Sequence, residues 1–172
     1  DTIQVAVNRA FQPWFFEVLS SETIIPHKEA VKLSYLLLTF YSFIYLIIGL
    51  FSQEAVFLMT NNDYLMAWTV VPIITFGYLI KSIYYIYLNI LLYHKREARK
   101  LFIATTIGSV ADIFIAFLLI PIIDIYGAAI AFVISKLIIV MIVMFISKKY
   151  ANIGYKISSI TKILAPSIIA MA

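Results

Sequence analysis

Long apolar runs alternate with short polar segments along the chain of 172 residues. The clearest runs cover residues 34–51, 64–93, 102–120 and 127–147, and a last run covers residues 160–172. A bilayer core about 30 Å thick needs roughly 20 mostly apolar residues for one helical crossing, and most of these runs approach or exceed that length. The pattern therefore predicts an all-α polytopic membrane protein, with residues 1–172 forming a single transmembrane region.

The first stretch, residues 3–20, is less apolar than the later runs because polar side chains recur within it. Gln4, Asn8 and Gln12 follow one another at four-residue spacing, so a helix here would have one polar face and one apolar face. Such a face fits a helix that lines a wet cavity, and it also fits an amphipathic helix lying in the membrane interface. If this stretch is counted with the five apolar runs, we expect about six helices. Because the sequence lacks an initial Met and ends inside an apolar run, we expect a fragment of a longer protein.

The composition supports a membrane protein. Hydrophobic residues make up 63% of the chain and charged residues 13%, whereas soluble domains are about 45–50% apolar and about 25% charged. A water-soluble globular domain is therefore excluded. The chain has no cysteine, which also excludes disulfides, a thiol nucleophile and a thiolate metal site.

Lysine and arginine are concentrated in alternate loops. The loops at 21–33, 94–101 and 147–162 contain them, whereas those at 52–63 and 121–126 contain none. Basic loops stay in the cytoplasm because their translocation is unfavourable. We therefore predict that the three basic loops are cytoplasmic and the other two external. The net charge of +4 then reflects topology, and no nucleic-acid partner is expected.

Four charged residues fall near the middle of predicted spans: Arg9, Lys81, Asp112 and Lys136. A charge at the bilayer centre costs about 2.5–3.5 kcal/mol on insertion scales, so such groups face the bundle interior or water. A salt bridge between Lys81 and Asp112 would be geometrically feasible on consecutive antiparallel helices. Even with that pair, an excess of positive charge remains at depth, as an anionic substrate would require.

Two predicted helices carry polar stripes at three- and four-residue spacing, which point inward because a lipid-facing helix has no reason to align hydroxyls. The stripes consist of Thr75, Tyr78, Ser82, Tyr85 and Asn89, and of Thr105, Ser109 and Asp112. They fit hydrogen bonds between helices or the lining of a cavity, and we favour the cavity. The candidate substrate site is a cationic cavity formed by Arg9, Lys81 and Lys136. Its lining or charge partners are Asp112, Tyr78, Tyr85, Asn89, Ser109, Asn8 and Gln12.

Backbone features within the spans have two interpretations. Pro72 falls inside the span 64–93, where it fits either a packing kink or a hinge for conformational switching. Gly127, Ala131 and Ser135 form a stripe of small residues at four-residue spacing, which predicts the close approach of another helix.

Enzymatic chemistry has no support in the sequence. His27 and His94 lie in predicted loops, where we expect solvated side chains with no further ligand to complete a metal site. The chain has no GxSxG nucleophile elbow, HExxH pair or Gly-rich phosphate loop. We therefore predict a protein that is not an enzyme and that uses neither a cofactor nor a metal.

Three segments resemble a known family. Residues 8–17 (NRAFQPWFFE) look like the helix of O-antigen and capsular polysaccharide flippases that reads roughly N-x-A-x-x-P-W-x-x-E. Residues 50–93 are similar to the next two helices of that family, and residues 111–135 resemble its N-x-x-x-N-x-x-L-I-P-x-x-G-x-x-G-A-A-I-A-T signature. Asp112 and Ala116 depart from the usual asparagines, and Phe132 departs from the usual threonine.

The resemblance extends over about residues 3–165 and implies a polysaccharide-biosynthesis flippase of the multidrug/oligosaccharidyl-lipid/polysaccharide exporter superfamily. By this comparison the chain is half of a two-lobed transporter fold, the C-terminal lobe without its first helix. It would lie in the inner membrane of a bacterium or archaeon and move an undecaprenyl-pyrophosphate-linked oligosaccharide by alternating access. Implied partners are the N-terminal lobe, membrane lipid and a polysaccharide polymerase. The alternatives are a cation-coupled multidrug exporter, which would need cavity carboxylates, and a non-transporting membrane scaffold whose deep charges pair with one another.

Overall fold

The structure, a computed structural model, describes residues 1–20, 24–59, 62–94, 98–150 and 154–171. Within these ranges the chain is all-helical and has no strand, as predicted. The α-helices are α1 (Thr2–Ser20), α2 (Ile24–Leu50), α3 (Ser52–Met59), α4 (Val71–Tyr93), α5 (Ala98–Lys148) and α6 (Ile157–Met171). A 3-10 helix, η1 (Asn62–Thr69), precedes α4.

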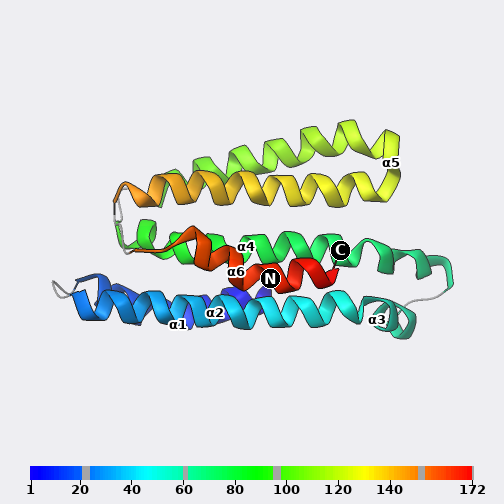
Figure 1. Cartoon of the computed structure of the whole chain (residues 1–172). Coiled ribbons are helices and arrows are strands. Elements are labelled where there is room, and N and C mark those ends of the chain that lie inside the picture. Colours follow the sequence, from blue (N-terminus) through cyan, green and yellow to red (C-terminus); the bar gives the residue numbers. More distant parts are fainter. Residues whose placement is uncertain (21–23, 60–61, 95–97, 151–153, 172) are drawn as a thin grey trace.

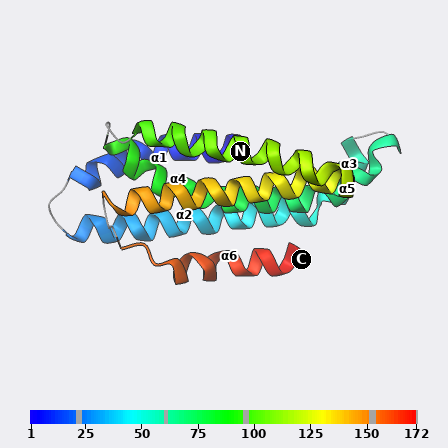
Figure 2. The same cartoon turned by 90° about the horizontal axis from the view of Figure 1, so that it is seen from above.

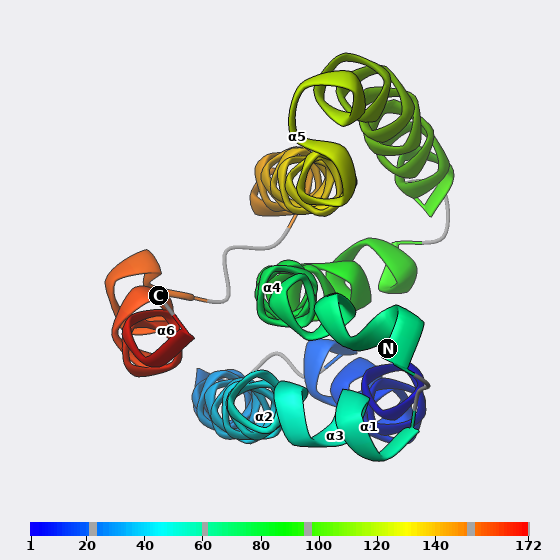
Figure 3. The ribbon, with the colours of Figure 1, turned by 90° about the vertical axis from the view of Figure 1, so that its right-hand side faces the viewer.

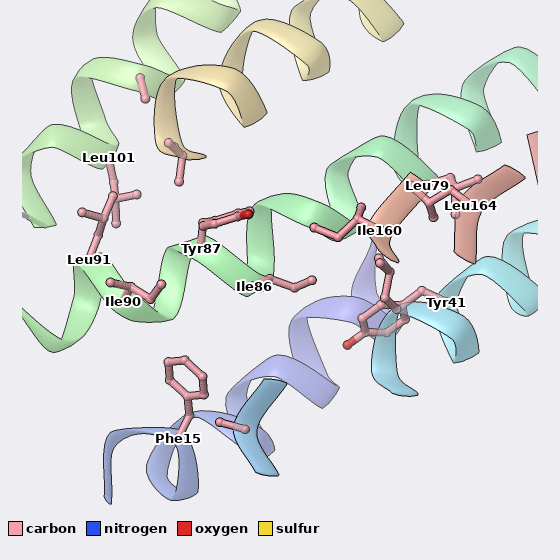
Figure 4. Close-up of a cluster of buried hydrophobic side chains, with 14 of the residues drawn as sticks. Phe15, Tyr41, Leu79, Ile86, Tyr87, Ile90, Leu91, Leu101, Ile160 and Leu164 are labelled. Atoms are coloured by element: carbon pink, nitrogen blue, oxygen red, sulfur yellow. The ribbon is translucent and has the colours of Figure 1, made fainter. Parts of the chain in front are cut away.

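Helix α4 is the centre of the bundle, because it contacts α1, α2, α5 and α6. It lies between the α5 hairpin on one side and α1 with α2 on the other (Figure 1). Figure 2 shows α6 along the edge of the bundle opposite α1. The buried core in Figure 4 joins these elements through apolar and aromatic side chains. Its members include Phe15, Tyr41, Leu79, Ile86, Tyr87, Ile90, Leu91, Leu101, Ile160 and Leu164.

Three helices of the described chain are long and apolar enough to cross a membrane: His27–Leu50, Met66–Tyr93 and Ala98–Lys148. The last of these contains two predicted spans. Residues 3–20 and 160–172 were also predicted to cross; their described parts form α1 and α6, which do not meet the same measure of length and hydropathy. Large apolar side chains on α5 are exposed, among them Phe117 and Phe145. An exposed apolar surface of this extent is typical of a face that contacts lipid or another protein.

Helix α5 is a hairpin of two arms, residues 98–122 and 125–148. Its backbone leaves helical geometry only at Ile123 and Asp124, and Asp124 has a positive φ of 47°. With ψ of −130°, Asp124 lies outside the left-handed helical region that aspartate tolerates, so the turn is strained there. The loop predicted over 121–126 is therefore wrong in extent, because helical geometry continues up to a two-residue turn. Each arm is about 36 Å long at 1.5 Å per residue, which is enough to cross a bilayer core.

The predicted stripe of small residues lies where the two arms touch. Gly127, Ala131 and Ser135 are all buried. A Cβ atom on Gly127 would lie 2.5 Å from the backbone carbon of Leu119, so only glycine permits this approach. Further along the hairpin, a Cβ on Gly108 would lie 3.4 Å from the backbone oxygen of Ser135. The expected close helix approach is confirmed, and it occurs within the α5 hairpin.

Two boundaries differ from the sequence prediction. Helix α2 begins at Ile24 rather than near residue 34, because Pro26 lies in its first turn, where proline is tolerated. Pro72 lies in the first turn of α4 rather than inside a longer helix. Its missing N–H therefore removes no helical hydrogen bond, and the expected kink or hinge at Pro72 is wrong.

The alternating loops lie at opposite ends of the bundle. The α1–α2, α4–α5 and α5–α6 junctions share one end, and the bend of α5 lies at the other with α3 and η1 (Figure 1). We call the first end the basic end, because described basic residues gather at its junctions: Lys28, Lys32, Arg99, Lys100, Lys148, Lys149 and Lys156. Lys95 and Arg96 lie outside the described residues. The grouping of basic segments is confirmed; their cytoplasmic orientation stays a prediction.

Candidate functional site

A cavity of about 360 Å³ lies between α1, α4 and both arms of α5. Figure 3 shows α4 between α1 and the α5 hairpin, the elements that form its walls. Asp1, directly before α1, and Val5 of α1 contribute to the lining, and the two arms of α5 contribute Thr105, Ser109, Lys136, Ile139 and Val140. Helix α4 contributes Lys81, Tyr84, Tyr85 and Leu88. The volume falls in the usual range of small-molecule sites, about 300–1,000 Å³.

Helical periodicity brings these side chains to one place. On α4, Lys81, Tyr84, Tyr85 and Leu88 recur at three- and four-residue steps and so share one face. Thr105 and Ser109 repeat at the same spacing on the first arm of α5. The walls of the cavity thus combine two ammonium groups, one carboxylate, several hydroxyls and an apolar remainder.

Lys81 and Asp1 form an ion pair in the cavity wall. The Lys81 Nζ lies 2.9 Å from both carboxylate oxygens of Asp1. The Tyr85 hydroxyl donates a hydrogen bond of 3.1 Å to the same carboxylate. The Lys81 side chain is 22% exposed and that of Asp1 is 39% exposed. Lys81 and Tyr85 together therefore bind a carboxylate, which shows that this corner can hold an oxyanion.

The salt bridge between Lys81 and Asp112 that the sequence allowed does not form, because the Asp1 carboxylate pairs with the Lys81 ammonium instead. Asp112 instead lies within electrostatic range of Lys136, as does Lys81. The Lys136 Nζ lies over the Phe132 ring, 4.5 Å from its centroid. The Lys136 ammonium therefore has an aromatic face beside it, and Lys136 lines the same cavity as Lys81.

Arg9 is not part of the cavity. Its side chain is exposed and does not line the cavity wall. Asn8, its neighbour, lies level with Asn89, one turn before the end of α4 at Tyr93. Arg9 therefore lies nearer the basic end of α4 than its middle, and α1 runs in the same direction as α4.

The polar face of α1 packs against α4. Gln4 and Asn8 are buried. The Gln4 side-chain amide donates to the Ser82 hydroxyl at 2.6 Å, and the side chains of Asn8 and Asn89 bond to each other. Asn8 and Asn89 therefore connect helices and do not line the cationic cavity, and Ser82 from the α4 stripe does the same. The interpretation of these groups as interhelical hydrogen bonds is the correct one.

The remaining candidate residues separate in space. Tyr85 and Ser109 line the cationic cavity, as predicted. Tyr78 lies outside its lining and stacks on Tyr45 of α2, with ring centroids 6.0 Å apart. Gln12 is half-buried on α1 and also lies outside the lining.

A second, much smaller cavity lies between α1, α2 and α4. Its volume is about 20 Å³, and its polar lining includes Asn8, Ser34, Ser82 and Asn89. A space of this size accommodates about one water molecule when two or more polar partners surround it. This cavity has no role in binding a larger ligand.

Sequence reasoning missed Asp1 as a cavity residue. The signal was present, because Asp1 precedes Val5 by four residues and Gln4 by three and so belongs to the polar side of α1. It could not be used without the position of α1 along α4, which decides whether Asp1 reaches a cation.

Neither histidine has the solvated environment that was expected. His27 and His94 are both half-buried. The backbone N–H and the Nδ1 atom of His94 both lie near the Ile90 carbonyl oxygen, where they close the end of α4. Among the described residues, no three histidine, aspartate or glutamate side chains gather in a geometry that could hold a metal ion.

No family model, curated protein or solved structure matches the chain.

Proposed function

We propose that this chain is part of a multi-pass flippase that moves an anionic lipid-linked oligosaccharide across the cytoplasmic membrane of a bacterium or archaeon by alternating access. The observation that carries the proposal is that Lys81 and Lys136, from different helices, line one cavity together with hydroxyl groups. The substrate would carry a pyrophosphate between its polyprenyl chain and its sugars. No chemical step is needed, so the protein would be a transporter and not an enzyme.

The cavity chemistry suits such a head group. Two lysines give the cavity an excess of positive charge over the single Asp1 carboxylate. Phosphate oxygens accept hydrogen bonds from ammonium groups, and charge-assisted bonds of this kind are stronger than neutral ones. Tyr85, Thr105 and Ser109 offer hydroxyls for the sugars, and Val5 and Leu88 offer apolar contacts.

The position of the cavity along the bundle also supports transport. Lys81 lies near the middle of α4, and Leu88 lies nearly two turns closer to the basic end. The cavity thus extends from mid-depth towards the end that we predict to be cytoplasmic, from which the substrate would enter. In this proposal an N-terminal lobe would complete the cavity, and these helices would form a two-lobed fold with it. A polysaccharide polymerase would receive the product on the other side.

One observation favours each alternative. The Asp1 carboxylate lines the cavity, as a cation-coupled multidrug exporter would require. The Asp1–Lys81 ion pair would serve equally in a membrane scaffold that transports nothing. In the exporter, Asp1 rather than the lysines would be essential; in the scaffold, loss of the lysines would affect stability alone.

The test uses the full-length protein in liposomes that contain a lipid-linked oligosaccharide, and it measures translocation to the outer leaflet. We expect Lys81→Ala and Lys136→Ala each to lower the rate by about tenfold or more, the effect of losing a hydrogen bond to a charged group. Arg9→Ala should retain transport, since Arg9 lies outside the cavity lining.

Lys162→Ala is the matched control, because Lys162 is exposed on α6, outside the cavity. Each variant must first show normal insertion and an unchanged melting temperature. Equal rates for Lys81→Ala, Lys136→Ala and Lys162→Ala would overturn the proposal.

A further inference from the structure

A second basic site lies at the open end of the α5 hairpin. It is a hollow of about 640 Å³, and its rim is formed by Lys100 on the first arm and by Lys148 and Lys149 at the end of the second. Lys148 and Lys149 are exposed. Three lysines and no acidic side chain of the described chain line this hollow.

The floor of the same hollow is apolar. It is formed by Ile103, Phe145 and Ile146, which lie about one helical turn from the lysines towards the bundle centre. Phe145 is 82% exposed, and Ile103 is 51% exposed. Charged groups therefore lie at the end of the hairpin, and apolar groups lie about 5 Å deeper along its axis.

Tyr150 fixes the rim. Its hydroxyl accepts a hydrogen bond from the Lys100 ammonium, which also lies 4.9 Å from the centre of its ring. The His94 ring packs on Tyr150 with centroids 5.8 Å apart. These contacts connect the ends of α4 and of both α5 arms and give Lys100 a defined position in the rim.

We propose that this hollow binds an anionic phospholipid, with its phosphate at Lys148 and Lys149 and its acyl chains along Ile103 and Phe145. The order of chemistry along the hairpin matches that of a lipid at the membrane surface, a phosphate above a hydrocarbon chain. Basic residues beside membrane helices attract anionic lipids in this way. The inference rests on the membrane location in the proposed function and is independent of transport.

The test is native mass spectrometry of the full-length protein in detergent, with phosphatidylglycerol and phosphatidylethanolamine of identical chains at equal concentration. We expect the wild type to retain phosphatidylglycerol preferentially. Lys148→Gln/Lys149→Gln should lower that preference by at least about tenfold, because each lysine near an anionic surface raises the binding constant by a factor of about five. Phe145→Gln should weaken the binding of both lipids to a similar degree, since it removes an apolar wall but no charge.

The matched control is Lys28→Gln/Lys32→Gln, which removes two exposed lysines of α2 at the basic end but outside the hollow. It should leave the preference unchanged. Equal losses in the two double variants would show general electrostatic attraction and overturn the site. A wild type without preference would overturn it too.

Displacement of the lipid by millimolar inorganic phosphate would show a free-phosphate site in place of a lipid site. Lipid retention is measured without oligosaccharide, so its failure is distinguishable from failure of the flippase proposal.

Discussion

The side-chain amides of Asn8 and Asn89 bond to each other across the contact between α1 and α4. The Asn89 Nδ2 donates to the Asn8 Oδ1 at 2.9 Å, and the Asn8 Nδ2 donates back to the Asn89 Oδ1 at 3.4 Å. Both side chains are buried, with exposed fractions of 7% and 1%. This reciprocal pair fixes how far α1 is shifted along α4, and the shift decides which residues of α1 reach the cavity.

The first prediction concerns this asparagine pair. Asn89→Leu should lower the free energy of unfolding by about 1–2 kcal/mol, because it leaves a buried amide on Asn8 without a partner. The double variant Asn8→Leu/Asn89→Leu should recover most of the loss, since neither amide then remains to be satisfied. Denaturant unfolding in detergent micelles measures both. A double variant as unstable as the sum of the singles would contradict the importance of the reciprocal bond.

The second prediction concerns the Asp1 carboxylate, which forms an ion pair with the Lys81 ammonium in the cavity. Asp1→Asn should raise the affinity for an anionic lipid-linked oligosaccharide, seen as a lower KM in the liposome assay, because a competing negative charge is removed. Stability should change little, as partly exposed ion pairs contribute about 0.2–1 kcal/mol. Asp1→Glu keeps the charge and is the control. Loss of transport in Asp1→Asn alone would favour the cation-coupled exporter.

The third prediction separates two glycines of the α5 hairpin. A Cβ at Gly127 would meet the backbone of Leu119 and Ile120, at 2.5 and 2.7 Å. A Cβ at Gly108 would instead meet a side chain rather than backbone, with the Cγ1 of Ile139 at 2.2 Å and its Cδ1 at 2.5 Å. Gly127→Ala should therefore cost about 3 kcal/mol or more, and Gly108→Ala less, in the overpacking range of about 1–3 kcal/mol.

A second substitution provides the internal check on these glycines. Ile139→Ala removes the atoms that crowd Gly108, so Gly108→Ala/Ile139→Ala should be more stable than the sum of its singles by about 1 kcal/mol. The same Ile139→Ala change should not rescue Gly127→Ala, whose neighbours are backbone atoms. Rescue of both glycine variants to the same degree would count against the hairpin geometry.

The fourth prediction compares two tyrosines whose rings touch, with centroids of Tyr87 and Tyr155 5.6 Å apart. The Tyr155 hydroxyl bonds to Ser34 at 2.9 Å, and burial raises the pKa of Tyr155. The Tyr87 hydroxyl is buried without a hydrogen-bond partner among the described residues. Tyr87→Phe should therefore raise the free energy of unfolding by about 1 kcal/mol, and Tyr155→Phe should lower it by about as much. Thermal melting in detergent measures both, and equal shifts of the same sign would contradict the assignment.

Much of the helical architecture could be predicted from the sequence, because helix length and hydropathy are local properties. The spans over 102–120 and 127–147 are the two arms of α5, and the stripe of small residues from Gly127 marks their contact. The turn between the arms lies within the loop predicted at 121–126, but it was predicted too long, because the bend needs only two residues. The start of α2 was also missed, since proline in a first turn resembles a loop signal in sequence.

The candidate site was predicted in part. Lys81, Lys136, Tyr85 and Ser109 do line one cavity, because charged and hydroxyl groups within apolar helices must face inward. Arg9 lies outside this lining, since the pairing of Asn8 with Asn89 places it nearer the end of α4. Ser82 and Asn89 share a stripe with Tyr85, yet they face α1 rather than the cavity.

The sequence by itself determined that the chain is helical, that the segments over 34–51, 64–93, 102–120 and 127–147 are apolar enough to cross a membrane, and that basic residues gather at one end. These properties follow from the composition of each segment and from the 3.6-residue period. Only the tertiary structure decided that Asp1 pairs with Lys81, that Asn8 pairs with Asn89, and that Lys136 shares a cavity with Lys81. The physical reason is that such pairings depend on the rotation and axial shift of one helix against another. Those quantities are set by packing between helices, and no single helix encodes them.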